Sequence, residues 1–290
     1  MSLQISETSY YLGIKVRKDK DGIYSISQTG YIEKLLKTYR MEEAKESKIP
    51  LDIGYRKMKD ESNRVEKKKY QSLIGALIYV ATNTRIDIAA SVSILSRKMN
   101  CPTESDWIEA KRIIRYLKGT KDLKLILGSK EKEKNILVGY SDADWAQDVE
   151  DRKSNSGYLF KFNGGTISWA CRRQSCVALS STEAEYVALA EACQEAVWLR
   201  NLLKDFNEEQ VQPTVIFQDN QSCIKLVSKD KYSKRTKHIS TKYNYVKDLS
   251  DTGITSYKYC PTEIMIADVL TKPLEQIRLK NLRQQGDMNG

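Results

Sequence analysis

Hydrophobic and polar positions in the first half of the chain follow the pattern of a β-hairpin and several amphipathic helices. Apolar residues gather on both sides of Asp21-Gly22, a dipeptide typical of a tight turn between two strands. Further along, apolar residues recur three and four positions apart, as on one face of a helix. The elements predicted for this half are a hairpin over 10–27, helices over 31–39, 70–100 (a pair) and from about 103 to Gly119, and an extended connection over 42–69.

From about Asn135 onward, short apolar runs alternate with helical patterns. Asn163-Gly164-Gly165 separates two of these runs and predicts a hairpin. Ser180 and Glu183 have the spacing of a capping box, which marks the start of a helix. The predicted elements are strands over 136–146, 158–162, 166–170, 214–219 and 254–259, and helices from about 180, 220, 239 and 262. This order predicts an α/β fold, with a mixed sheet and helices on both of its faces.

The run 136–146 is the most informative stretch of the chain. Its apolar residues predict a buried central strand, and it ends in Asp142 and Asp144. Carboxylates at the end of a buried strand are unfavourable unless a positive charge meets them, and oxygen ligands suit Mg²⁺. The alternative is a turn at the sheet edge with two solvated aspartates. Of the two residues, Asp142 is the preferred ligand, with Asp144 as an outer group.

Three further acids lie on other predicted elements. Asp219 ends another apolar strand, Glu185 lies in the first turns of a helix, and Asp268 lies in the last helix. Functional groups in such folds collect beyond the carboxyl ends of the strands. Gathered there with Asp142, these acids would need cations, and two Mg²⁺ ions could clamp a phosphodiester between them, with Mn²⁺ as an alternative. Glu183 competes with Glu185, but the two point in different directions on a helix.

Composition narrows the classes of protein and partner. Residues 1–135 carry 28 Lys+Arg against 18 Asp+Glu, so the whole net charge of +10 lies in this half. A basic half beside a half with clustered acids suggests a polyanion that one half holds and the other half acts on, although a solvated basic surface would have the same charge. The only histidine is His238 and no Cys-x-x-Cys pair occurs, which argues against zinc.

With no secretory signal and no long apolar run, we expect a cytoplasmic or nuclear protein, neither secreted nor embedded in a membrane.

Four basic residues fall in predicted loops near the acids. They are Arg152, Lys153, Arg172 and Arg173. Phosphate contacts position a nucleic acid without reading its sequence, so these residues are candidates for nucleic-acid binding.

A series of ordered motifs resembles the C-terminal part of the Pol polyprotein of copia-type LTR retrotransposons. In the first half these motifs are Tyr11-Leu12-Gly13-Ile14, Tyr70-Gln71-Ser72-Leu73-Ile74-Gly75, Thr84-Arg85-Ile86-Asp87 and Tyr116-Leu117-Lys118-Gly119-Thr120. In the second half they are Ser141-Asp142-Ala143-Asp144-Trp145, Arg152-Lys153-Ser154-Asn155-Ser156-Gly157, Leu179-Ser180-Ser181-Thr182-Glu183-Ala184-Glu185, Gln218-Asp219-Asn220 and Ala267-Asp268-Val269-Leu270-Thr271-Lys272-Pro273.

The resemblance implies two parts. Residues 1–134 would be the end of the reverse transcriptase, a mainly helical thumb or connection remnant with a β-hairpin. Residues 135–290 would be a ribonuclease H-like domain with a mixed five-stranded sheet flanked by helices. By the same match, the metal-binding catalytic carboxylates would be Asp142, Glu185, Asp219 and Asp268. The substrate would be the RNA strand of an RNA–DNA hybrid, and the upstream polymerase part of the polyprotein would be a partner.

Three departures from the family pattern bear on activity. No Tyr-x-Asp-Asp motif occurs, so the chain should not polymerise DNA. Ile86 replaces the usual proline, and Cys260-Pro261-Thr262-Glu263 stands where many cellular ribonucleases H have a histidine. The alternative to a nuclease is a catalytically inactive remnant that still binds nucleic acid, because the resemblance covers only the end of the polymerase.

Overall fold

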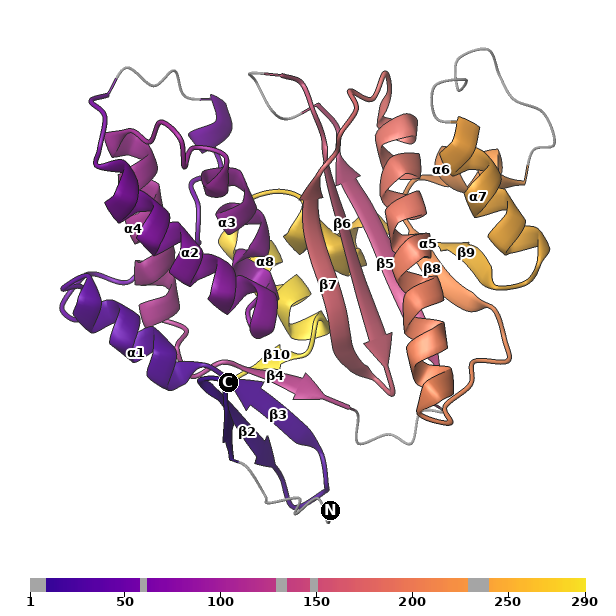
Figure 1. The fold of residues 1–290 in the computed structure, drawn as a ribbon, viewed down its shortest axis with the longest axis horizontal. Coiled ribbons are helices and arrows are strands. Elements are labelled where there is room, and N and C mark those ends of the chain that lie inside the picture. Colours follow the sequence, from indigo (N-terminus) through magenta and orange to yellow (C-terminus); the bar gives the residue numbers. More distant parts are fainter. Residues whose placement is uncertain (1–8, 58–61, 129–134, 147–150, 229–239) are drawn as a thin grey trace.

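The described part of the chain contains two five-stranded sheets, each packed against helices (Figure 1). The computed structural model describes residues 9–57, 62–128, 135–146, 151–228 and 240–290. His238 lies outside the described residues. Within them, no helix is both long and apolar enough to cross a membrane.

The second sheet is the predicted mixed sheet, with the strand order β7-β6-β5-β8-β9. The central strand β5 (Leu137–Asp144) pairs antiparallel with β6 (Asn155–Phe162), which pairs antiparallel with β7 (Gly165–Arg173). On its other side β5 pairs parallel with β8 (Thr214–Gln218), and β8 pairs parallel with β9 (Thr255–Tyr259). The ribonuclease H-like fold class predicted from the sequence is thereby confirmed.

One face of this sheet is covered by α5 (Ser181–Asp205), with α6 (Gln221–Val227) and α7 (Ser240–Asp251) beyond it (Figure 1). Leu137 and Phe160 of the sheet, Tyr186 of α5 and Val246 of α7 share one buried apolar core. The predicted capping residue Ser180 is the N-cap of α5 and accepts a hydrogen bond from the backbone of Glu183. The sequence signals for these helices were therefore correct.

Within its described residues, the first half contains four α-helices and, together with the last strand of the chain, forms an antiparallel sheet. Its strands lie in the order β1 (Tyr10–Tyr11), β2 (Ile14–Lys18), β3 (Tyr24–Ser27), β4 (Lys124–Leu127) and β10 (Met288–Asn289). Its helices are α1 (Thr29–Thr38), α2 (Lys67–Asn83), α3 (Ala89–Ser96) and α4 (Glu104–Lys118). The predicted hairpin and helices are confirmed, whereas β4 and β10 were not predicted.

The end of the chain differs from the prediction of a single helix from about Thr262 that contains Asp268. The structure has two 3₁₀ helices, η4 (Thr262–Ile264) and η5 (Ile266–Leu270), followed by α8 (Gln276–Gln285). The backbone of Met265 is extended, with ψ near 98°, and separates the two short helices. Pro273 lacks the N–H that a continuing helix would need, which ends this region before α8 begins.

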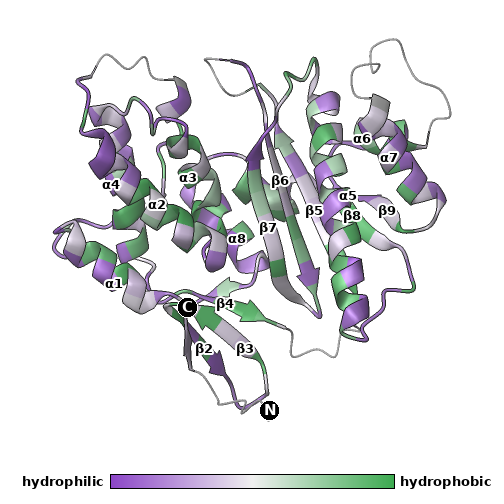
Figure 2. Ribbon diagram, viewed as in Figure 1, coloured by the Kyte–Doolittle hydropathy of each residue, from purple (hydrophilic) through white to green (hydrophobic). Residues whose placement is uncertain are grey.

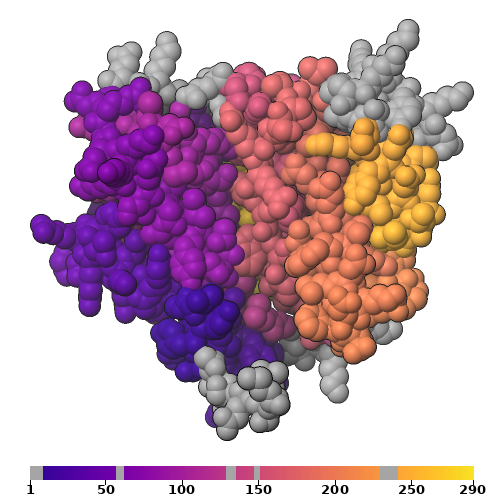
Figure 3. Space-filling view, viewed as in Figure 1, coloured from indigo at the N-terminus to yellow at the C-terminus, as the bar shows by residue number. Residues whose placement is uncertain are grey.

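The other face of the second sheet packs against the first half. Figure 2 shows hydrophobic residues along β6 and β7 and along the neighbouring helices α2 and α3, and in Figure 3 the two halves meet without a break on this face. The Trp169 indole N–H donates to the carbonyl of Ala81 at 3.0 Å. Leu282 of α8 and Met288 of β10 are buried in the core of the first half. The predicted boundary at 134/135 borders residues outside the described ranges, so the division of the chain at that point stays a prediction.

Candidate metal centre

A glycine in β6 lets η5 pack closely beside the buried acids at the end of β5. Asp142 is 2% exposed and lies opposite Gly157 of β6. A Cβ at Gly157 would lie 2.7 Å from Cγ2 of Thr271 and 2.9 Å from Cβ of Leu270. The glycine therefore lets η5 pack directly on β6, and this close packing brings the residues that follow η5 to Asp142.

Three of the four predicted acids converge at this point. Single carboxylate oxygens of Asp142, Glu185 and Asp219 all lie within 4.8 Å of one another. Strands β5 and β8 are parallel neighbours, so Asp142 near the end of one and Asp219 just after the other emerge at the same edge of the sheet. The first turns of α5 add Glu185 from the helix layer.

The start of α5 separates the roles of its two glutamates. The carboxylate of Glu183 accepts a hydrogen bond from the backbone N–H of Leu179 at 2.9 Å, so Glu183 acts as a capping residue. Glu185, two positions along, is the one whose carboxylate lies in the acidic cluster. Glu183 is therefore a capping residue and Glu185 is the glutamate of the cluster, and the role of Glu185 as a metal ligand stays a prediction.

Electrostatics at the cluster favour a bound cation. Burial raises the pKa of Glu185 well above its usual value, and the nearby charges of Asp142 and Asp219 raise it further. Burial and the charge of Asp142 also raise the pKa of Asp219. The Oε2 atom of Glu185 is buried and has no hydrogen-bond partner. A divalent ion would satisfy that oxygen and relieve the repulsion, so these residues fit the hard, oxygen-bound cation predicted from the sequence.

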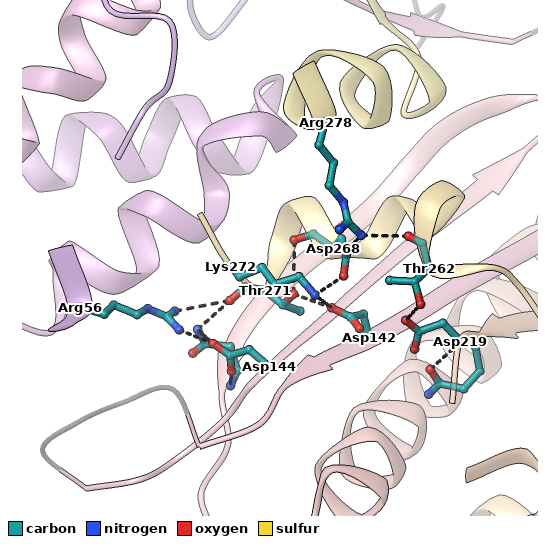
Figure 4. Close-up of polar contacts among 11 residues, drawn as sticks. Arg56, Asp142, Asp144, Asp219, Thr262, Asp268, Thr271, Lys272 and Arg278 are labelled. Atoms are coloured by element: carbon teal, nitrogen blue, oxygen red, sulfur yellow. Dashed lines mark hydrogen bonds and ion pairs between the residues drawn. The ribbon is translucent and has the colours of Figure 1, made fainter. Parts of the chain in front are cut away.

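Asp268 lies on the other side of Asp142, and its carboxylate is paired with basic side chains (Figure 4). One oxygen is 2.5 Å from the Lys272 ammonium, and the other accepts a hydrogen bond from Arg278 of α8. Burial and the charge of Asp142 raise the pKa of Asp268 to about 7. Thr271 donates a hydrogen bond to Asp142 at 2.5 Å. Sequence reasoning missed Thr271, Lys272 and Arg278 as site residues, although Lys272 follows Asp268 by four positions in a motif.

Asp144 has a different environment from Asp142. It accepts hydrogen bonds from the side chain of Arg56 and from the backbone N–H of Asn155. These partners satisfy its charge, and it does not belong to the cluster formed by Asp142, Glu185 and Asp219.

The four predicted nucleic-acid contacts lie near the same end of the sheet. The placement of Arg172 and Arg173 in a loop was wrong, because both lie in strand β7. They pair with Ser156 and Asn155 of β6, and Asn155 also lies opposite Asp144. Arg172 is exposed, with its guanidinium 5.6 Å from the centre of the Tyr158 ring. Arg173 forms an ion pair with Asp151.

The two remaining basic residues precede β6. Arg152 is exposed and Lys153 half-buried. Their contact with nucleic acid stays a prediction.

Comparison with known proteins identifies the family. No protein-family model matches the chain. The chain is 38% identical, over 270 residues or 90% of its length, to the retrovirus-related Pol polyprotein from transposon TNT 1-94 of Nicotiana tabacum. The chain belongs to the Pol polyprotein family of copia-type retrotransposons. It spans 20% of the tobacco polyprotein, so it corresponds to a segment of such a Pol.

Two further similarities concern parts of this Pol segment. It is 53% identical over 130 residues, or 45% of its length, to the secreted RxLR effector protein 161 of Plasmopara viticola, of which 90% is matched. The crystal structure of LC11-RNase H1 in complex with RNA/DNA hybrid matches 47% of the segment and 93% of that chain, with 13% identity and a TM-score of 0.36. The strand order of the second sheet and the family membership make the second part of the Pol segment a ribonuclease H-like domain, and it carries a candidate acidic site.

Proposed function

We propose that this Pol segment is a metal-dependent ribonuclease H, which cleaves the RNA strand of RNA–DNA hybrids formed during reverse transcription. The observation that carries the proposal is the cluster of Asp142, Glu185 and Asp219 at the carboxyl ends of two parallel strands, with a buried Glu185 oxygen that lacks a partner. Asp268 completes the proposed set of catalytic carboxylates, because it lies against Asp142.

The residues around the cluster hold its carboxylates in place. Thr271 donates to Oδ2 of Asp142, and Thr262 donates to Oδ2 of Asp219 at 2.8 Å. These hydrogen bonds leave the other oxygen of each aspartate available as a ligand, and they fix the two carboxylates before any ligand arrives. A divalent ion bound here, Mg²⁺ or Mn²⁺, would supply the positive charge that activates water and stabilises negative charge on a phosphodiester.

The proposed substrate accounts for the charge distribution. A net charge of +10 attracts a polyanion, and exposed Arg152 and Arg172 near the acidic end of the sheet could contact phosphates without reading bases. A hybrid can be distinguished from DNA duplexes by its shape and by the 2′-hydroxyl groups of the RNA strand. The upstream polymerase part of the polyprotein, which would supply the hybrid, is the proposed protein partner.

The test is cleavage of a labelled RNA–DNA hybrid with Mg²⁺, alongside binding of the same hybrid measured by fluorescence anisotropy. Asp142→Asn and Asp219→Asn should reduce cleavage by at least about a hundredfold, on the scale of losing an electrostatic catalytic group. Both variants should keep hybrid binding. Asp248→Asn, which makes the same chemical change at an exposed position of α7, serves as the matched control.

The outcome separates the nuclease from the alternative function. Cleavage by the unaltered chain that is lost in both site variants supports the proposal. Hybrid binding without cleavage by the unaltered chain supports a catalytically inactive nucleic-acid-binding remnant. Cleavage of a DNA duplex at the same rate as the hybrid would refute the substrate assignment.

A further inference from the structure

A lysine ammonium occupies the space between two of the acids. Nζ of Lys272 lies 2.5 Å from Oδ1 of Asp268 and 3.8 Å from Oδ2 of Asp142. Figure 4 shows its side chain reaching across from the turn after η5 to lie between these two carboxylates. The side chain of Asp268 is fully buried, whereas that of Lys272 is 34% exposed, so the amine has a path to solvent.

The backbone fixes where this lysine begins. The N–H groups of Thr271 and Lys272 both donate to the carbonyl of Asp268, and Pro273 follows directly. Because Thr271 is also hydrogen-bonded to Asp142, the turn is held against β5. The fold therefore fixes the start of this side chain, and the ion pair with Asp268 holds its ammonium.

The two sides of Asp142 differ in their need for a cation. On one side, Asp142, Glu185 and Asp219 bring three carboxylates together, and the Oε2 atom of Glu185 has no partner. On the other side, Asp268 already has Lys272 on one oxygen and Arg278 on the other. One side is thus short of positive charge, and the other side has its positive charge built into the chain.

We propose that the Lys272 ammonium takes the cation position between Asp142 and Asp268, so that the chain binds one divalent ion tightly at Asp142, Glu185 and Asp219. A second ion can bind between Asp142 and Asp268 only when the lysine amine moves out to solvent. The inference rests on the proposed metal-dependent function and adds to it a competition between a side chain and the second ion.

The competition has a measurable size. A divalent ion that must displace an ammonium loses the free energy of that ion pair, and coupling between two such bound charges is typically worth about fivefold to 150-fold in affinity. Lys272→Met removes the charge and keeps a similar apolar stem. Lys280→Met makes the same change on the exposed side of α8, and it is the matched control.

The experiment titrates the full chain with Mn²⁺ alone and follows free Mn²⁺ by electron paramagnetic resonance. The unaltered chain and Lys280→Met should each bind one ion tightly and a second at least tenfold more weakly. In Lys272→Met the second ion should bind about tenfold more tightly than in the unaltered chain. Two ions of equal affinity in the unaltered chain, or no change in Lys272→Met, would overturn the inference.

A second measurement needs no variant. Acetic anhydride labels exposed lysine amines, and mass spectrometry compares Lys272 with Lys280 in the unaltered chain at each Mn²⁺ concentration. Labelling of Lys272 relative to Lys280 should be low at first and should rise severalfold as the second ion binds. Constant labelling through that range contradicts displacement of the amine.

The results also distinguish this inference from the proposed function. A chain that cleaves hybrids but binds two Mn²⁺ ions equally would remove the role of Lys272 and leave the nuclease intact. A chain that binds no Mn²⁺, and binds none in Lys272→Met, would remove both.

Discussion

Arg56 and Asp144 form an ion pair that joins the two halves of the chain (Figure 4). Arg56 lies on η1 (Tyr55–Lys57), in the connection between α1 and α2, and Asp144 is the last residue of β5. Both side chains are buried, with 9% and 2% of their surface exposed. The same guanidinium also donates to the carbonyl of Thr271 at 3.4 Å. One arginine from the first half thus contacts the strand and the turn that shape the acidic site.

Replacing Arg56 with methionine should lower the free energy of unfolding by about 3 kcal/mol, because it leaves a buried carboxylate without its charged partner. Burial raises the pKa of Asp144, and the charge of Arg56 opposes that effect. Urea denaturation measures the loss. Lys121→Met is the control, since its pair with Glu33 is exposed on both sides and should contribute less than about 1 kcal/mol. Equal small losses in both variants would mean that the pair does not hold the halves together.

Patterns among neighbouring residues were sufficient to predict most helices and strands, and to predict that Asp142 and Asp219 lie together. The helix predicted from about residue 103 is α4, and the structure adds a capping box between Thr103 and Asp106 at its start. Asp142 and Asp219 could be placed together because each follows an apolar run, and strand ends in an α/β fold meet at one edge. These inferences need only the periodicity of neighbouring residues.

The missed features depend on contacts between residues far apart in sequence. Met288–Asn289 has no periodicity of its own and becomes a strand only because β4 is beside it. Arg56 and Asp144 are 88 positions apart, and no spacing rule connects them. The sequence predicts a single helix from about Thr262 that contains Asp268, but Pro273 and the extended Met265 limit this region to short 3₁₀ turns. Its pairing with Arg278 follows only from how α8 packs.

Gly157 should be essential for bringing η5 to the acidic site. In Gly157→Ala the added methyl group would lie 3.1 Å from the carbonyl oxygen of Ala267 and closer still to two side chains, so η5 must move. We expect a loss of about 2 kcal/mol in the free energy of unfolding, as for an overpacked core, together with weaker Mn²⁺ binding. Thermal melts and the Mn²⁺ titration measure these two effects.

The control for that substitution is Gly75→Ala in α2. A Cβ at Gly75 meets nothing within 4 Å. Alanine in an exposed helical position should stabilise the chain by about 0.5–1 kcal/mol and leave Mn²⁺ binding unchanged. If both alanine variants changed stability in the same direction, close packing at Gly157 would not be the cause.

The free energy of unfolding should fall in acid, in part because the buried carboxylate of Asp87 in the first half becomes protonated. Burial would raise the pKa of Asp87, but Arg85, which holds both of its oxygens, and the hydroxyl of Tyr116 lower it below its ordinary value. A carboxyl whose pKa is depressed in the folded state stabilises the protein above its unfolded pKa of about 3.9, and this contribution is lost as pH falls through the folded pKa.

The measurement is the free energy of unfolding between pH 7 and pH 3 for the unaltered chain and for Asp87→Asn. At pH 7 the variant should be less stable by about 3 kcal/mol, because Arg85 is left buried without its counter-charge. The difference should shrink as the pH approaches 3. Asp122→Asn, at an exposed position, should follow the unaltered chain throughout. A difference that does not vary with pH would show that the ionised form of Asp87 is not what stabilises the fold.

Helix α8 should stabilise the first half of the chain more than the second sheet, although the second sheet directly precedes α8 in sequence. Leu282 of α8 is fully buried in the same core as Leu73 and Ile113 of α2 and α4, so Leu282→Ala should cost about 3 kcal/mol. Ile277→Ala on the same helix is the control, since Ile277 is 77% exposed and should change stability by less than about 0.5 kcal/mol. Hydrogen exchange followed by mass spectrometry locates the effect. Faster exchange in Leu282→Ala is expected in α2 and β4, and faster exchange confined to β8 and β9 would contradict this placement of α8.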